Sequence, residues 1–380
     1  MPTVNNQTKA ASSAITVGAK APTVMDAKGF YKPFQYPWAF QYYQTQNKMH
    51  WVPEEVKLHS DVKDWKTRLL PEEKFLLTQL FRFFTTGDVD IGQAYIDKYM
   101  ATFRNEEVRM MLGAFMNMES VHAEAYSLLM DTVGMPESEY KAFKKYEVMA
   151  AKHDYLLEFD ISDELSVARA LAVYSAFTEG LQLFSTFAIL MNFQRFGKMR
   201  GMCEIVEYSI KDESLHVEAM IKLYRTYMHE HPHLDTPAFK ADIAQICQKM
   251  VQLEDDFIDM AFSMGEIEGL TSGEVKSYMG EIEGLTSGEV KSYIRFIANR
   301  RMMQLGMEPI YAVEKNPLGW LDHIMSAVVH TNFFESRSTE YAKGALTGTW
   351  DAVWASVDSV NDLIQEATEN SHQIMEEVTA

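Results

Sequence analysis

The sequence predicts an all-α protein, a bundle of long helices with acids and imidazoles inside. Helical periodicity dominates from about residue 65 to about residue 300, with few Gly or Pro breaks and no sustained alternating pattern of a strand. Within this region two Glu-x-x-His pairs, Glu119/His122 and Glu213/His216, each lie inside a long apolar helical pattern. We therefore expect polar side chains to meet in the core of the bundle.

The first and third predicted core helices each carry one acid on an apolar face. Leu77, Phe81 and Phe84 precede Asp88 at alternating steps of four and three residues, so the acid points where the apolar side chains point. Glu179 lies on a similar stripe of the third helix. A carboxylate in such a position needs a partner.

The second and fourth predicted helices each place an acid and an imidazole on one face, because residues three apart are neighbours on a helix. Tyr126 lies one turn beyond His122 on the same stripe, although a lone buried tyrosine is more often a packed core residue. Four-helix proteins that bind two iron or manganese ions combine two Glu-x-x-His pairs with one carboxylate from each other helix. The chain fits this arrangement helix by helix.

Four carboxylates in one core require compensating positive charge, because each unpaired buried carboxylate costs several kcal/mol. Two divalent cations would supply it. Oxygen and imidazole ligands without thiolate suit iron or manganese, while zinc or copper would also bind. Glu-x-x-His also occurs at Glu230/His233 and Glu369/His372, but neither pair lies in an apolar helix, so we treat both as chance matches.

Composition disfavours several classes of protein. The net charge of −19 would repel nucleic acid and anionic membranes. Cys203 and Cys247 lack the spacing of a disulfide framework or a zinc ribbon, which favours a reducing cytoplasm. No apolar run approaches the roughly 18 residues of a membrane span, and the first 25 residues lack the hydrophobic segment of a secretory signal.

An exact tandem duplication interrupts the helical pattern, since Met264–Tyr278 recurs as Met279–Tyr293. It is too short for a solenoid, which needs several repeats to build a core. One copy can fill the place of the original segment while the other bulges to the surface. We expect no catalytic role for the extra copy.

Four motifs give the chain a specific resemblance. They are WVPEEV at Trp51–Val56, MESVHAEAY around the first pair, KDESLH around the second, and NPLGW at Asn316–Trp320. With these motifs, from about Phe40 to Thr347, the chain resembles the small, radical-generating subunit of class I ribonucleotide reductase. The resemblance implies a ferritin-like helical bundle with a dimetal-carboxylate core and a partly mobile C-terminal tail.

The resemblance also implies the ligands. It favours a diiron-oxo centre, with manganese as the alternative, and bridging carboxylates. Each ion would have three ligands: Asp88, Glu119 and His122 for one, and Glu179, Glu213 and His216 for the other.

Radical chemistry follows from the same resemblance. Tyr126 would carry a stable radical, and Asp212 would accept a hydrogen bond from His122 and link it to Trp51. Tyr341, in the tail, would hand the radical to a separate large subunit. Further residues would wall the radical from water: Leu183 and Phe187.

The implied activity is that of the small subunit of ribonucleoside-diphosphate reductase. The metal pair activates oxygen, the radical passes to the large subunit, and ribonucleotides are reduced there to deoxyribonucleotides. This chain has no phosphate-binding loop, so substrate binding would belong to the partner. The family also pairs as a homodimer through its long helices.

We expect three segments: a disordered or loosely packed N-terminal tail at 1–30, the ferritin-like domain at 31–335, and a docking tail at 336–380. The nearest alternative is a diiron or manganese–iron oxidase or oxygenase on the same fold, acting on a small apolar substrate. It would need a pocket near the metals and no Tyr341. A metal-storage or structural protein would need neither the Trp51–Asp212 pair nor a shielded tyrosine.

Overall fold

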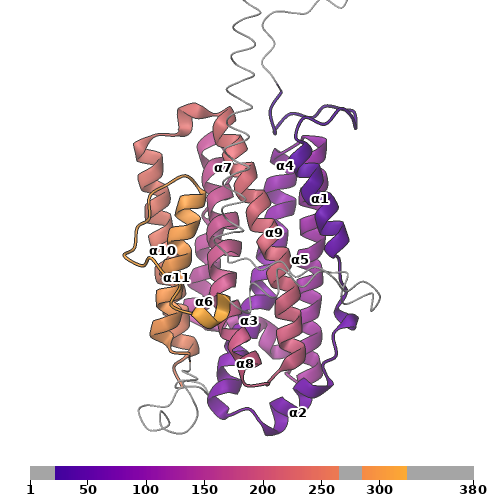
Figure 1. The fold of residues 1–380 in the computed structure, drawn as a ribbon, viewed down its shortest axis with the longest axis vertical. Helices are drawn as coiled ribbons and strands as arrows, with labels where there is room; N and C mark the ends of the chain where they lie inside the picture. Colours follow the sequence, from indigo (N-terminus) through magenta and orange to yellow (C-terminus); the bar gives the residue numbers. More distant parts are fainter. Residues whose placement is uncertain (1–21, 265–284, 323–380) are drawn as a thin grey trace, which may run out of the picture.

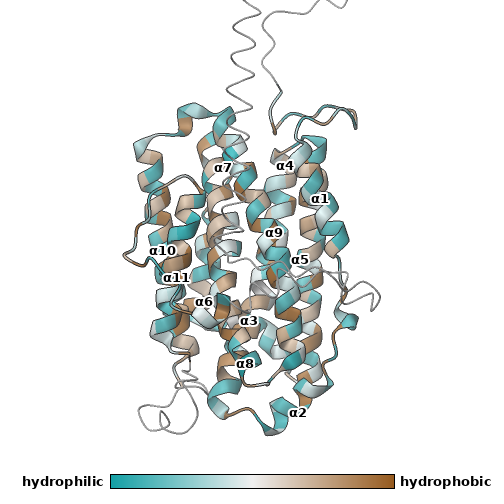
Figure 2. Ribbon diagram, in the orientation of Figure 1, coloured by the Kyte–Doolittle hydropathy of each residue, from teal (hydrophilic) through white to brown (hydrophobic). Residues whose placement is uncertain are grey.

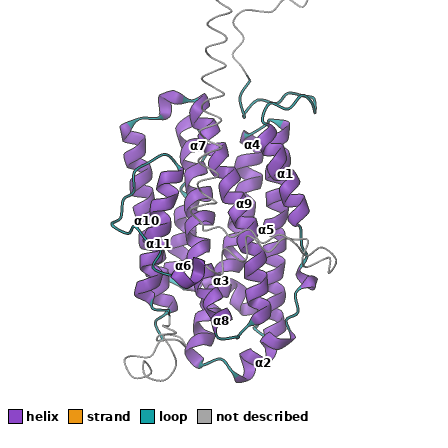
Figure 3. Ribbon diagram, viewed as in Figure 1, coloured by secondary structure: helices purple, strands orange, loops and turns teal. Residues whose placement is uncertain are grey.

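A computed structural model describes residues 22–264 and 285–322 (Figure 1). Long helices pack side by side, and these two ranges contain no strand (Figure 3). The all-α prediction is confirmed. None of the helices in the described ranges combines the length and the apolarity needed to cross a bilayer.

Four stretches of helix surround the centre of the bundle, and they are α3 (Pro71–Ala94), α5 (Glu106–Val133), the π-helix η4 (Ala172–Leu183) and α9 (Arg200–Glu230). The remaining helices are α1 (Pro37–Met49), η1 (Pro53–Glu55), α2 (His59–Thr67), η2 (Tyr95–Tyr99), α4 (Met100–Thr102), η3 (Glu137–Lys145), α6 (Glu147–Leu157), α7 (Glu164–Leu171), α8 (Phe184–Arg195), η5 (Pro232–Leu234), α10 (Pro237–Ala261) and α11 (Ser287–Gln304).

Local signals set the ends of α5. The Asn105 side chain accepts a hydrogen bond from the Val108 N–H at the start, where the first amide groups lack helical partners. Gly134 ends the helix with φ 84°, a left-handed conformation that glycine adopts without strain. The helix between them is long enough to span the bundle with the first Glu-x-x-His pair near its middle (Figure 1).

The start of α9 is capped by another helix. Asp61 of α2 accepts hydrogen bonds from the Gly201 and Met202 N–H groups at 2.9 and 2.8 Å. This approach requires glycine, because a Cβ on Gly201 would lie 2.7 Å from Leu58 Cδ2. Helix α2 therefore fixes the N-terminal end of the helix that carries the second Glu-x-x-His pair.

One continuous helix runs through the middle of the bundle, and its consecutive segments are α7, the π-helix η4 and α8. Every residue of η4 is buried. Arg301 of α11 donates a hydrogen bond from Nε to the Gly180 carbonyl at 2.7 Å. π-Helical turns are rare and often lie at functional sites. Helices α5, α9 and α10 carry both polar and apolar residues, as amphipathic helices do (Figure 2).

Part of the predicted N-terminal tail lies against the bundle. Val24 is buried and donates its N–H to Glu230 at the end of α9. Lys28 Nζ lies 2.6 Å from a carboxylate oxygen of the buried Glu107 in α5. Residues 22–30 thus contact the ends of two core helices, while residues 1–21 and the predicted docking tail lie outside the described ranges.

The second copy of the tandem duplication begins α11. Thr286 caps this helix by accepting the Glu289 N–H, and the Glu289 carboxylate accepts the Thr286 N–H in return. Val290 and Tyr293 then pack into the core. Apart from Met264, the first copy lies outside the described residues.

Candidate metal centre

The six predicted ligands lie together inside the bundle, and at most 3% of any of these residues is exposed. They come from four different stretches of helix: Asp88 from α3, Glu119 and His122 from α5, Glu179 from η4, and Glu213 and His216 from α9. Residues three apart on α5 and on α9 face the same way, which delivers each pair to the centre.

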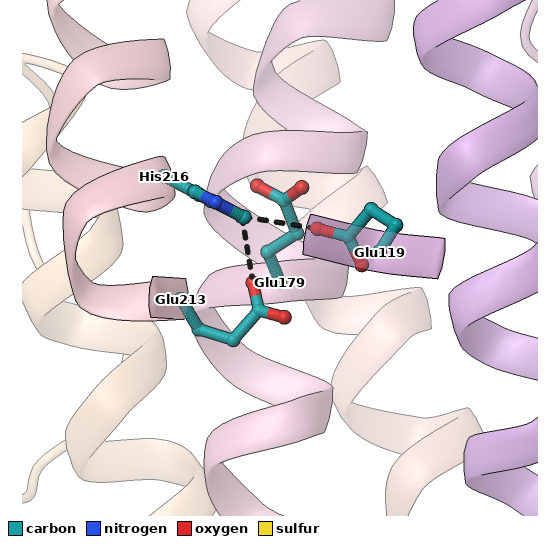
Figure 4. A group of neighbouring side chains, drawn as sticks. All are labelled: Glu119, Glu179, Glu213 and His216. Carbon is teal, nitrogen blue, oxygen red and sulfur yellow. Dashed lines mark ion pairs between the residues drawn. The ribbon is translucent and has the colours of Figure 1, made fainter. Parts of the chain in front are cut away.

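Four of these side chains form a compact cluster, shown in Figure 4. Glu119, Glu179, Glu213 and His216 each offer a ligand atom, and these atoms all lie within 4.8 Å of one another. Oxygen and imidazole ligands at this spacing suit a transition-metal ion.

Both imidazoles direct Nδ1 at the same two carboxylates. His122 Nδ1 lies 3.2 Å from Glu213 Oε1 and 3.7 Å from Glu119 Oε2. His216 Nδ1 lies 3.0 Å from Glu119 Oε1 and 3.5 Å from Glu213 Oε2. Glu119 and Glu213 therefore lie between the two imidazoles.

The second ring nitrogen of each imidazole, Nε2, contacts a residue that is not a predicted ligand. His122 Nε2 lies 3.0 Å from Asp212 Oδ2, and His216 Nε2 lies 3.1 Å from Gln46 Oε1. Because a carboxylate or an amide oxygen only accepts, each imidazole carries its hydrogen on Nε2. In the neutral ring this leaves the Nδ1 lone pair for a metal ion, the usual arrangement of metal-binding histidines.

The centre holds polar atoms that the protein leaves without hydrogen bonds. Buried polar atoms are normally paired, since leaving one unpaired costs about 1–3 kcal/mol or more. Among the described residues, six of the nine buried side-chain atoms without a hydrogen bond belong to predicted ligands: Asp88 Oδ2, Glu119 Oε1 and Oε2, Glu179 Oε2, Glu213 Oε2 and His216 Nδ1. The other three belong to Asn105, Arg109 and Gln182. A pair of divalent cations fits this donor set, because it would satisfy these atoms and cancel their charge.

Without cations, the same groups must share protons. Burial raises the pKa of Asp88 and of Glu179 well above their usual range. Burial alone would lower the pKa of His216, but the carboxylates of Glu119 and Glu213 raise it to about 10. Burial opposes ionisation of Glu119 as well, yet the neighbouring imidazoles lower its pKa to about 2. Metal binding would displace these protons.

Comparison with known proteins gives the family. The family model "Ribonucleotide reductase, small chain" matches residues 29–281. The chain is 40% identical over 370 residues to a probable ribonucleoside-diphosphate reductase small subunit of Invertebrate iridescent virus 6, covering 87% of this chain and 99% of the relative. The chain belongs to the ribonucleotide reductase small chain family. That family forms part of an oxidoreductase, and a small chain implies a large-subunit partner.

Solved structures agree on the fold. The small chain matches the ribonucleotide reductase R2 subunit of Clostridium botulinum with a TM-score of 0.67 at 22% identity, covering 77% of this chain and 89% of that one. It matches the dimanganese(II) protein NrdF of Streptococcus sanguinis with a TM-score of 0.64 at 18% identity, covering 79% and 100%. The predicted ferritin-like fold is confirmed.

In this small chain, a hydrogen-bonded link runs from the cluster to Trp51. Trp51 Nε1 donates to Asp212 Oδ2 at 2.8 Å, and the same oxygen lies 3.0 Å from His122 Nε2. The Trp51 and His122 rings are stacked with centroids 6.1 Å apart. Trp51 lies between α1 and η1, so the link joins the N-terminal part of the chain to α5 and α9.

Tyr126 lies in an aromatic pocket beside the cluster. Its ring stacks on Phe84 with centroids 4.4 Å apart, and Phe84 stacks on Phe187 at 5.4 Å. The hydroxyl donates a long hydrogen bond to Ser209 Oγ at 3.5 Å. Tyr126, Phe187 and Leu183 are almost completely buried. Sequence reasoning singled out Leu183 and Phe187 as the shield but missed that Phe84 makes the direct contact.

The sequence analysis also missed two residues that contact the predicted metal ligands. Gln46 of α1 contacts both Asp212 and His216, and no pattern in its polar surroundings pointed to it. Tyr95 donates its hydroxyl to Glu179 Oε1 at 2.9 Å. Tyr95 was detectable, because it continues the stripe of Asp88 and Ile91 at steps of three and four residues.

Proposed function

We propose that this small chain forms a radical at Tyr126 with the help of two metal ions and passes it to a separate large subunit, where ribonucleoside diphosphates become deoxyribonucleotides. The observation that carries the proposal is the position of Asp212 Oδ2, within hydrogen-bonding distance of both Trp51 Nε1 and His122 Nε2. A metal-storage protein has no use for a buried tryptophan joined in this way to a ligand.

The ligands divide into two sets in this proposal. All six residues would hold the metal pair, and Glu119 and Glu213 each lie close to both imidazoles. When bound, the metal pair would supply the oxidising power, by activating oxygen, that removes one electron from Tyr126. We propose iron, with manganese as the alternative. The ligand sets are Asp88, Glu119 and His122 for one ion and Glu179, Glu213 and His216 for the other.

The protein contributes a dry environment for Tyr126. Burial, reinforced by the Asp88 carboxylate, raises the pKa of Tyr126, so the phenol is neutral before oxidation. Loss of one electron, with transfer of the phenolic proton toward the neighbouring Asp88 carboxylate, would then leave a neutral radical. Phe84 covers its ring and Phe187 stacks on Phe84, and together they would exclude water and reductants.

In this proposal, Trp51 carries the radical from Tyr126 toward the large subunit. An electron moves from Trp51 to the Tyr126 radical, which takes its phenolic proton back from the side of Asp88. The indole proton of Trp51 can move to Asp212, to which it is already hydrogen-bonded. Tyr341, which we propose as the donor that completes the path, lies outside the described residues. We also propose a homodimer, with the nucleotide site on the large subunit.

The oxidase alternative requires room for an organic substrate beside the metals. A cavity of about 30 Å³ is lined by neighbours of two predicted ligands along the chain, Gly87 before Asp88 and Thr178 before Glu179, but by none of the six predicted ligands. This volume suits a water-sized molecule rather than an organic substrate. The cavity therefore gives no specific support to the alternative.

Electron paramagnetic resonance at low temperature tests the proposal. Metal-free protein is loaded with ferrous iron and exposed to oxygen, and we expect a tyrosyl signal. Tyr126→Phe should bind the same amount of metal, give no such signal and lack reductase activity. Reductase activity in Tyr126→Phe, or the same signal from that variant, would contradict the proposal.

Two further outcomes are informative. A signal that appears only after loading with manganese and a suitable oxidant would change the metal and keep the radical. Absence of any tyrosyl signal with either metal, together with no dependence on a large subunit, would favour the oxidase. Tyr341→Phe should keep the Tyr126 signal and lose turnover with the large subunit.

A further inference from the structure

The Trp51 ring has a second aromatic neighbour, on the side chain of Tyr208. The two ring centroids are 5.1 Å apart with an angle of 33° between the planes. Tyr208 lies on α9 one turn before Asp212, so the residue that holds the indole N–H and the residue that covers the ring belong to the same helix. Trp51 is 3% exposed, whereas Tyr208 is only partly buried.

Tyr208 lies on the partly exposed face of α9. Glu204, one turn earlier, and Lys211, one turn later, share that face and are also partly buried. The Tyr208 hydroxyl donates a long hydrogen bond to Glu204 Oε1 at 3.5 Å. Lys211 Nζ lies 5.5 Å from the centre of the Tyr208 ring. The phenol therefore has a proton acceptor at its hydroxyl and a cation over its ring.

We propose that Tyr208 carries the radical between the buried Trp51 and the protein surface. This inference rests on the proposed function, which supplies the oxidant. A buried tryptophan cannot meet a partner protein directly, and a ring in contact with it on the accessible side shortens the remaining distance. The path would then run from Tyr126 through Trp51 to Tyr208 and on to a redox-active side chain at the docked surface.

The step balances in electrons and protons. One electron passes from the Tyr208 ring to oxidised Trp51, which returns to its closed-shell form and takes back any proton it had given to Asp212. The O–H bond of Tyr208 breaks, and its proton forms a new O–H bond on the Glu204 carboxylate. Reduction of Tyr208 by the next donor reverses the proton transfer.

The charges around Tyr208 favour a neutral radical. Removing only an electron would leave a positive ring beneath the Lys211 ammonium group, and the two positive charges would repel each other. Moving the proton to Glu204 avoids this. Tyr208 therefore needs its hydroxyl for the relay, whereas packing against Trp51 needs only the ring.

Tyr208→Phe separates these two roles in the full-length, metal-loaded small chain. We expect an unchanged Tyr126 signal, unchanged affinity for the large subunit, and turnover reduced at least about tenfold. Tyr208→Trp, which restores an oxidisable ring, should recover part of the turnover. Tyr42→Phe is the matched control, because Tyr42 donates to Glu218 and lies beside Trp38 but not beside Trp51.

A spectroscopic test uses 3-aminotyrosine, which is easier to oxidise than tyrosine, in place of Tyr208. On mixing with large subunit and ribonucleotide, we expect an aminotyrosyl signal to grow as the Tyr126 signal decays. The same replacement at Tyr42 should give no such signal.

Different results would overturn the inference and the proposed function. No Tyr126 signal in the unmodified protein would mean that the proposed function fails. A normal Tyr126 signal with full turnover in Tyr208→Phe would overturn the relay alone. A lower radical yield or weaker large-subunit binding in Tyr208→Phe would make Tyr208 a structural residue and would also overturn the relay.

Discussion

Gln46 Nε2 donates a hydrogen bond to Asp212 Oδ1 at 2.7 Å, and this bond joins the two halves of the metal centre. The Gln46 carbonyl oxygen contacts His216 Nε2, while Asp212 contacts His122 Nε2. The orientations of both imidazoles therefore depend on one neutral side chain of α1. Trp51 is hydrogen-bonded to the same carboxylate, so the candidate metal centre and the proposed radical path share this network.

Replacing Gln46 should weaken metal binding. Gln46→Ala leaves His216 Nε2 without its acceptor and Asp212 with one donor fewer, and loss of such a partner typically lowers metal affinity about 10- to 100-fold. Titration against a competing chelator measures the affinity. Gln44→Ala, an exposed site on the same helix, is the control. Equal affinities in the two variants would show that Gln46 does not orient the ligands.

Tyr95 should influence one metal ion more than the radical. Tyr95→Phe removes the hydrogen bond to Glu179 Oε1, and we expect affinity for the ion bound by Glu179 to fall about tenfold while Tyr126 is still oxidised. Metal titration and radical yield at saturating metal are the measurements. Tyr99→Phe is the control, since the Tyr99 hydroxyl donates to a backbone carbonyl, that of Ala170. A Tyr126 signal lost at full metal loading would contradict the prediction.

Phe84 should determine how long the Tyr126 radical survives. Phe84→Leu keeps an apolar side chain but removes the stacked ring, which opens space for water beside Tyr126. We expect a shorter half-life of the tyrosyl signal at unchanged metal content. Phe103→Leu, equally buried but in contact with Tyr99 and Tyr227, should lose stability without changing the half-life. Identical half-lives in the two variants would remove Phe84 from the shield.

Metal binding should release protons near neutral pH. The pKa of His216 is raised to about 10 in the metal-free centre, so its imidazole is protonated at about pH 7.5 and must lose that proton to bind a metal ion. The pKa of His122 is also raised above its usual range, despite the opposing effect of burial. We expect release of about two imidazole protons per chain, in addition to any proton that Asp88 and Glu179 hold in the metal-free centre. Calorimetry in buffers of different ionisation enthalpy measures it, and no buffer dependence would refute the prediction.

The raised pKa of His216 also predicts how the free energy of unfolding of the metal-free protein depends on pH. A histidine whose pKa is raised on folding stabilises the fold fully below its unfolded pKa of about 6.5. That contribution is lost as the pH rises toward about 10. The free energy of unfolding of the metal-free protein should therefore fall over this range. Metal-loaded protein, whose imidazoles are held without that proton, should lack this loss, and denaturant titrations of both forms compare them.

The sequence predicted which acids and imidazoles enter the core because the relevant spacing is local. Asp88 aligns with Phe81 and Phe84 on one helix, and Glu119 aligns with His122 on another, through helical geometry alone. The stripe that contains Asp88 continues to Tyr95, which the sequence analysis did not single out. The ferritin-like fold followed from these patterns and the family resemblance.

Contacts between distant segments were beyond sequence reasoning. The capping of α9 by Asp61, the contact of Gln46 with His216 and the packing of Tyr208 on Trp51 each join residues far apart in the chain. No local pattern encodes them, because they depend on the register and crossing of packed helices.

The sequence by itself therefore determined which side chains share a helix face, and with them the acids and imidazoles that enter the core. The tertiary structure decided that Glu119 and Glu213 lie between the imidazoles. It also placed Gln46 beside His216 and Tyr208 beside Trp51. The physical reason is that helix faces are set by bonds within one segment, whereas side-chain contacts across helices are set by packing of the whole core.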